Sequence, residues 1–110
     1  MLKTEAIKLT NGGSTPRFTI LEIELLRDLV PSDLIELSQH NLHFLIDSKK
    51  GVILNGRAPV WLYGFLVHSL HATAWIATND PRLGAVVVES HTPNVITGDV
   101  INWKSELFMI

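Results

Sequence analysis

Short apolar runs alternate along the chain with clusters of turn-forming residues, the pattern expected when strands and helices follow one another. Alternating apolar and polar positions predict a half-buried strand over 17–25, and the continuous run Val52-Ile53-Leu54 predicts a strand over 51–55 that is buried on both faces. The segment Asn11-Gly12-Gly13-Ser14 predicts a turn. Further strands are expected at 6–9, 74–79, 84–89 and 99–103.

Two segments have the features of helices. Pro31 begins a short one over 31–37, and Pro59 begins a longer one that runs to about Leu70, because proline has no N–H to leave unpaired in a first turn. The longer helix is apolar nearly all round, so it is expected to pack against a sheet or in a subunit interface. Residues 41–50 fit helix or strand equally. The elements together predict one small α/β domain over residues 1–110, with a mixed sheet and flanking helices.

Composition narrows the class of protein. Hydrophobic residues make up 46% of the chain and charged residues only 18%, which predicts apolar surface shared with a partner and hence a homo-oligomer. The formal net charge of −2 argues against binding DNA or long RNA, which requires clustered Lys and Arg. There is no cysteine, so disulfides and thiol chemistry are excluded. No apolar run is long enough to span a membrane, and the chain is expected to be soluble and cytoplasmic.

The turn after the strand at 51–55 is a candidate anion site. Gly56 and Arg57 stand between that strand and the helix that begins at Pro59, where free backbone N–H groups and the positive end of the helix dipole hold phosphates in α/β proteins. Arg57 can clamp a phosphate with two parallel hydrogen bonds. The alternative is that Gly56 only permits the turn and Arg57 is a solvated surface cation.

A second set of polar residues follows the long helix. His71, Asp80 and His91 offer neutral nitrogen and hard oxygen ligands of the kind that manganese accepts, and Arg82 adds a permanent cation beside them. His68 lies one helical turn before His71 and is an alternative to it. Each residue also has an ordinary structural explanation: Asp80 before a proline is a common turn starter, and a histidine at a strand end often has no chemical role.

These residues stand in segments that resemble a known family. The segments span residues 51–101, and they look like the small CRISPR-associated Csx-three family, also called CRISPR ring nuclease three. Residues 1–50 are similar only in length and general pattern. The segments include Gly56-Arg57-Ala58-Pro59, Asp80-Pro81-Arg82-Leu83-Gly84, Ser90-His91-Thr92-Pro93 and Gly98-Asp99.

The resemblance implies a function and a site. It implies a manganese-dependent phosphodiesterase that opens cyclic tetra-adenylate, the second messenger of type III CRISPR defence, and a homodimer related to the CRISPR-associated Rossmann-like fold. Two such dimers are expected to enclose one ligand as a tetramer. The ligand-binding turn would be Gly56, Arg57 and Pro59. The catalytic surface would be His71, Asp80, Arg82 and His91, with His71, Asp80 and His91 assigned to manganese or proton transfer and Arg82 to stabilising transition-state charge.

Three classes of function are carried forward. The first is the ring nuclease, the second is a binding module that holds cyclic oligoadenylate without cleaving it, and the third is an exoribonuclease or deadenylase acting on linear 3′ ends. The chain departs from the family in one place, since Ala72-Thr73-Ala74 follows His71 where the family usually has a proline. The approach to Asp80 is therefore expected to differ from that of other members.

Overall fold

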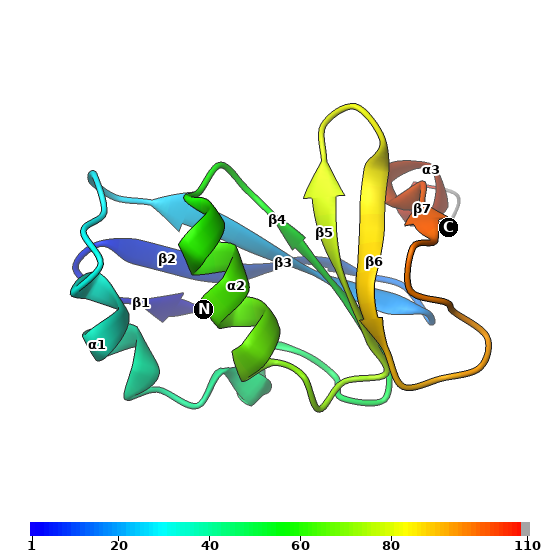
Figure 1. Cartoon of the computed structure of the whole chain (residues 1–110), viewed down its shortest axis with the longest axis horizontal. Coiled ribbons are helices and arrows are strands. Elements are labelled where there is room, and N and C mark those ends of the chain that lie inside the picture. The colour runs from blue at the N-terminus through cyan, green and yellow to red at the C-terminus, as the bar shows by residue number, and fades with distance from the viewer. Residues whose placement is uncertain (109–110) are drawn as a thin grey trace.

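The computed structural model of the chain describes residues 1–108 and contains a seven-stranded mixed sheet with helices on both faces (Figure 1). The strands are β1 (Leu2–Lys3), β2 (Ile7–Ser14), β3 (Phe18–Leu25), β4 (Gly51–Asn55), β5 (Trp75–Asp80), β6 (Gly84–Ser90) and β7 (Val100–Ile101). The helices are α1 (Asp33–Ser38), the 3₁₀ helix η1 (Leu42–Leu45), α2 (Val60–Ser69) and α3 (Trp103–Leu107). The α/β class and the mixed sheet are as the sequence predicts.

Strand order follows chain order from β1 to β7. Strands β3, β4 and β5 are parallel, and every other neighbouring pair is antiparallel. The connections that carry α1 and α2 cover the same face, so the parallel strands advance in one direction without reversing (Figure 1). We call the edge where β4 ends at Asn55 and β5 ends at Asp80 the carboxyl edge, and the edge where both strands begin the amino edge.

Each face of the sheet has its own core. Helix α2 packs Leu62, Leu66 and Leu70 onto the face that includes Leu54 and Ile76. The opposite face gathers Phe18, Ile53, Trp75 and Trp103. Val52, Ile53 and Leu54 are fully buried, which confirms that β4 has no wet face. No helix within residues 1–108 is long and apolar enough to cross a membrane.

Two local expectations were wrong. Asn11–Ser14 are the end of β2 rather than a turn, because β3 continues opposite them and a bulge between Asn11 and Gly13 absorbs the glycines. The turn comes one residue later, where the Thr15 hydroxyl accepts the backbone N–H groups of Arg17 and Phe18. The last strand ends at Ile101, and Trp103 begins α3, since its indole is buried in the second core.

Two further elements were left open or unpredicted. Within the ambiguous segment 41–50, residues 42–45 form the 3₁₀ helix, with the Asn41 side chain accepting the N–H of His43 at its start. The two-residue strand β1 was not predicted. Both elements are too short for a periodic signal to identify them.

Candidate ligand-binding site

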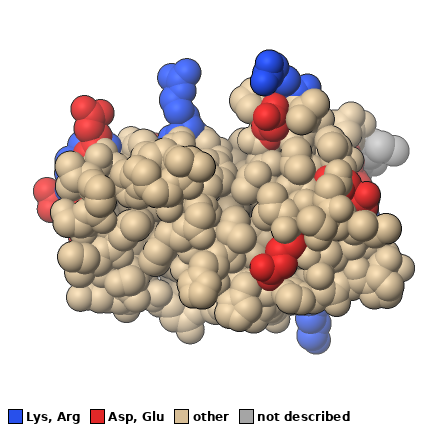
Figure 2. Space-filling view, in the orientation of Figure 1, with Lys and Arg blue, Asp and Glu red and all other residues tan. Residues whose placement is uncertain are grey.

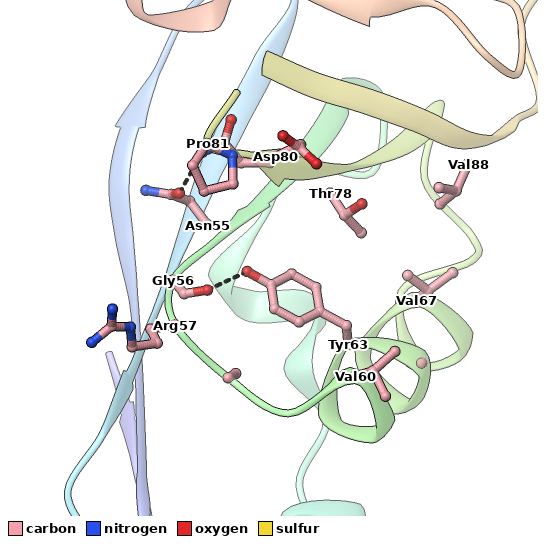
Figure 3. Close-up of a pocket in the computed structure, with 13 residues that line it drawn as sticks. Asn55, Gly56, Arg57, Val60, Tyr63, Val67, Thr78, Asp80, Pro81 and Val88 are labelled. Carbon is pink, nitrogen blue, oxygen red and sulfur yellow. Dashed lines mark hydrogen bonds between the residues drawn. The ribbon is translucent and has the colours of Figure 1, made fainter. Parts of the chain in front are cut away.

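A pocket of about 870 Å³ opens at the carboxyl edge between the β4–α2 turn, helix α2 and strands β5 and β6 (Figure 3). Its polar lining includes Asn55, Arg57 and Asp80. Its apolar lining includes Val67, Val88 and the Tyr63 ring. The volume falls in the range of small-molecule sites, roughly 300–1,000 Å³. The pocket can therefore take a nucleotide-sized group at its polar end.

The Gly56 turn is held rigidly against the sheet. Gly56 has φ +149°, and a Cβ there would lie 2.2 Å from the carbonyl oxygen of Ile23, so only glycine fits. The Tyr63 hydroxyl donates a hydrogen bond of 2.5 Å to the Gly56 carbonyl oxygen. Burial and the nearby Glu22 carboxylate raise the pKa of Tyr63, so this hydroxyl keeps its proton. The turn is thus fixed from the strand side and from the helix side.

Arg57 follows this fixed glycine and is exposed. Its side chain points away from the Tyr63 ring toward solvent (Figure 3), and it forms no ion pair within residues 1–108. Pro59 is the residue at the amino-terminal cap of α2, with extended backbone, and it does not itself line the pocket. The structure therefore brings Gly56 and Arg57 to the pocket and leaves Pro59 to begin the helix.

The β5–β6 turn supplies the other polar wall. The Asp80 carboxylate accepts the backbone N–H groups of Arg82 and Leu83 at 2.8 and 3.1 Å, and these bonds hold the pKa of Asp80 below its usual range. Arg82 is exposed and lines a smaller hollow of about 370 Å³ on the other side of the turn, together with Lys104. Asp80 lines both the pocket and the smaller hollow, so an ionised carboxylate stands between Arg57 in the one and Arg82 in the other.

The two histidines lie at the amino edge. His71 follows α2, and its Nδ1 donates to the His68 carbonyl oxygen at 2.9 Å while the two rings stack with centroids 5.9 Å apart. His91 follows β6, and its Nε2 lies 2.8 Å from the Glu89 carboxylate. Since a carbonyl or carboxylate oxygen only accepts, each neutral imidazole keeps one unprotonated nitrogen, Nε2 in His71 and Nδ1 in His91.

The predicted catalytic residues are not gathered in one chain. Asp80 and Arg82 lie at the turn at the top of β5 in Figure 1, whereas His71 and His91 lie at its lower end. The six residues of β5 separate the two groups by about 17 Å. Within residues 1–108, no group of three or more His, Asp or Glu side chains is placed to hold a metal ion. The manganese assignment of His71, Asp80 and His91 stays a prediction that requires more than one copy of the chain.

The sequence reasoning missed most of the residues that line the pocket, and three of them have polar side chains that form hydrogen bonds there. Asn55, Tyr63 and Asn79 all line the pocket. The two asparagines could have been found because each is a polar residue near the end of a buried strand, at the edge where parallel strands place ligands. Tyr63 gave no such signal, since it belongs to a helix that is apolar on all sides.

Comparison with known proteins agrees with the resemblance seen in the sequence. The model of the family of CRISPR-associated proteins named Cas_csx3 matches residues 22–102, a span that contains both edges of the sheet and every candidate residue described above. A protein of Aquifex aeolicus (strain VF5), described as an uncharacterized protein, is 49% identical over 111 residues, covering 94% of this chain and 96% of its own length. The chain belongs to the Cas_csx3 family of CRISPR-associated proteins.

Proposed function

We propose that this chain is a manganese-dependent phosphodiesterase that binds cyclic tetra-adenylate and opens its ring in the cytoplasm, switching off type III CRISPR signalling. Family membership supports the CRISPR setting. The observation that carries the proposal is the pocket at the carboxyl edge, where a rigid glycine turn presents the exposed Arg57 beside polar strand ends. Such a turn suits a phosphate, and the apolar lining of the pocket suits a base.

A cyclic tetra-anion is a demanding ligand for a chain of net charge −2. A single copy offers the ligand two exposed guanidinium groups, Arg57 and Arg82, one on either side of the β5–β6 turn. A ligand lying across a two-fold axis would meet these groups twice, so a symmetric dimer doubles the positive charge without a basic surface on either chain. The two-fold axis of the dimer would then coincide with a two-fold axis of the ring.

The amino edge, with His71 and His91, would supply groups for proton transfer and metal binding. Imidazole nitrogen and carboxylate oxygen suit manganese chemically, but the donors of one chain are too far apart to hold an ion together. We therefore propose that His71 and His91 of one dimer meet Asp80 and Arg82 of another when two dimers enclose the ligand. A bound manganese ion would polarise a phosphoryl oxygen there. The free nitrogens of the two histidines are available to accept a proton, and Arg82 to stabilise negative charge.

The face formed by α2, β5 and β6 is the proposed dimer surface. Figure 2 shows it largely without charge, apart from an acidic side chain over the lower part of β6, while Lys and Arg side chains project from its upper and lower borders. Val60 and Val88 are 84% and 42% exposed there, and with Gly64 they also line the pocket, so the proposed dimer surface borders the ligand site. Gly64 in the middle of α2 has nothing within 4 Å of its Cβ position. A helix glycine costs about 1 kcal/mol relative to alanine, and close approach by a second chain would explain it.

The dimer surface can be tested without any ligand. Gly64→Arg should leave the monomer folded, because the new side chain enters open space, and should shift the chain from dimer to monomer in sedimentation. His40→Ala, on an exposed segment between α1 and η1, is the control that should leave the dimer intact. A Gly64→Arg chain that sediments as wild type would contradict this surface.

One observation favours a second candidate, a binding module without turnover. Residues of a single chain form the pocket, whereas the proposed cleavage groups are split between the two edges of the sheet. If dimers do not stack, the chain would hold the ring without opening it. Binding that survives removal of metal, with no product formed, is the signature of this second function.

The test combines ligand, metal and variants. The purified chain is incubated with cyclic tri-, tetra- and hexa-adenylate and with a linear oligoadenylate, in manganese or in chelator, and products are separated by chromatography. Manganese-dependent loss of the tetra-adenylate ring, absent in His71→Ala and Asp80→Ala and retained in His40→Ala, supports the ring nuclease. Tight binding without cleavage supports the binding module, and preference for the linear chain supports the exoribonuclease. Absence of binding to every ring overturns the proposed function.

A further inference from the structure

A chain of side-chain hydrogen bonds crosses the carboxyl edge of the sheet. The Trp103 indole Nε1 donates to Asn79 Oδ1 at 2.8 Å, and Asn79 Nδ2 donates to Asn55 Oδ1 at 2.9 Å. Asn55 Nδ2 then donates to the Glu22 carboxylate, 3.1 and 3.2 Å from its two oxygens. The four residues come from α3, β5, β4 and β3, so this amide chain ties the last helix to three neighbouring strands.

The ends of the amide chain fix its direction. An indole nitrogen only donates a hydrogen bond, and an ionised carboxylate only accepts one. Between Trp103 and Glu22 each asparagine must therefore present its oxygen toward α3 and its nitrogen toward β3. Turning the Asn79 amide over would place nitrogen against the indole N–H and oxygen against the Asn55 oxygen, and two hydrogen bonds would be lost.

This arrangement leaves Asn79 with a committed orientation and a spare donor. One hydrogen of its Nδ2 goes to Asn55, and the other has no hydrogen-bond acceptor within residues 1–108. Asn79 is half-buried and lines both the large pocket and the smaller hollow beside Arg82. Because its oxygen bonds Trp103, the Asn79 side chain lies on the face of the second core, and its remaining hydrogen is on the side of the smaller hollow that Arg82 and Trp103 also line.

We propose that Asn79 contacts the ligand, donating its second amide hydrogen to a phosphate oxygen or an acceptor nitrogen of the base, and that Trp103 is a positioning residue that keeps the Asn79 oxygen turned away. The proposal rests on the proposed function, since it names a contact within the same nucleotide site. A freely rotating amide would offer its oxygen half of the time, and that oxygen repels a phosphate. The amide chain removes this unfavourable state before the ligand arrives, which is the usual way in which preorganisation raises affinity.

Affinity for cyclic tetra-adenylate in chelator, measured by titration calorimetry, tests the contact. Asn79→Asp keeps the shape and the acceptor for Trp103 but removes both donated hydrogens and adds a negative charge, so the dissociation constant should rise about tenfold or more. Asn79→Ser is a second, uncharged variant in case Asn79→Asp folds poorly, and its expected rise is about threefold to tenfold. Thermal unfolding of each variant reports whether the fold is retained.

A double-mutant cycle separates positioning from general stabilisation. Trp103→Phe should raise the dissociation constant about threefold when Asn79 is present and leave it unchanged in the Asn79→Ser background, because Trp103 acts through the amide. An equal effect of Trp103→Phe in both backgrounds, or wild-type affinity in both Asn79 variants, overturns the inference while the proposed function stands. Failure of the wild-type chain to bind the ring overturns the proposed function and this contact with it.

Discussion

The two edges of the sheet carry similar polar side chains and hold them in different ways. At the carboxyl edge, Tyr63 fixes the Gly56 turn and the amide chain fixes Asn79, in both cases through partners on other elements. At the amino edge, the side chains of His71 and His91 bond to groups only three and two residues away. A surface fixed by the fold can bind a ligand by itself, whereas one held by local contacts is suited to being completed by a second molecule.

The largest expected effect separates the edges by complementation. His71→Ala and Asp80→Ala each remove one edge's contribution and should lower ring cleavage by about 10²–10⁴-fold. A mixture of the two variants should recover about a quarter of wild-type activity, because stacking of unlike dimers rebuilds intact sites. The rate of product formation in the mixture, measured against each variant alone, is the readout. A mixture as inactive as its components would mean that one dimer does not complete the site of another, which would contradict the proposed stacking.

Arg57→Ala tests the carboxyl edge alone. Loss of a charge-assisted contact to phosphate should raise the dissociation constant for cyclic tetra-adenylate about ten- to hundredfold. It should also flatten the salt dependence of binding, because fewer counterions are released. Lys49→Ala removes an exposed cation just before β4, at the amino edge, and serves as the matched control. Equal losses in the two variants would mean that net charge, rather than the Gly56 turn, governs binding.

The fold was predictable where the sequence pattern is strong. The run Val52–Leu54 and the helix after Pro59 carry enough apolar residues to identify a buried strand and its crossover. The end of β2 was missed because glycine and asparagine normally break strands, and here a bulge accommodates them. In the sequence, Trp103 fits the end of a strand as well as the start of a helix. Its burial in the second core and its hydrogen bond to Asn79 accompany its place in α3.

The site was predictable residue by residue but not in its arrangement. Gly56, Arg57 and Asp80 stand at strand ends, and their meeting at one pocket follows from the parallel order of β4 and β5. The sequence did not show that His71 and His91 lie at the opposite end of β5 from Asp80. Grouping them as one catalytic surface assumed that all of these strand ends converge. Strand direction decides this, and direction depends on pairing across the sheet rather than on local pattern.

Tyr63→Phe tests how far the carboxyl edge depends on being fixed. Removing one hydroxyl keeps the ring in place and frees the Gly56 carbonyl, so affinity for the ring should fall about twofold to tenfold, the usual range for one hydrogen bond. Ser69→Ala removes another hydroxyl from α2. That hydroxyl donates a hydrogen bond of 2.9 Å to the Phe65 carbonyl oxygen, and neither residue lines the pocket. Calorimetric titration of both variants compares them directly. If Ser69→Ala weakens binding as much as Tyr63→Phe, the effect belongs to the helix and not to the turn.

The smallest expected effect distinguishes stability from function, using two carboxylates that the fold holds ionised. The side chain of Arg27 and the N–H of Val30 lower the pKa of Asp33, and the N–H groups of Arg82 and Leu83 lower that of Asp80. A carboxyl group with a lower pKa in the folded state stabilises it above its unfolded pKa of about 4, and this stabilisation is lost as pH falls through the folded value. The melting temperature should therefore fall as the pH drops below about 4.

Asp33→Asn should make the melting temperature less dependent on pH in that range while leaving ring binding at pH 7 unchanged, because Asp33 begins α1 and lines neither the pocket nor the smaller hollow. Asp80→Asn should weaken this dependence as well but abolish cleavage. If Asp33→Asn melts with the wild-type dependence on pH, the acid sensitivity of the fold does not come from Asp33.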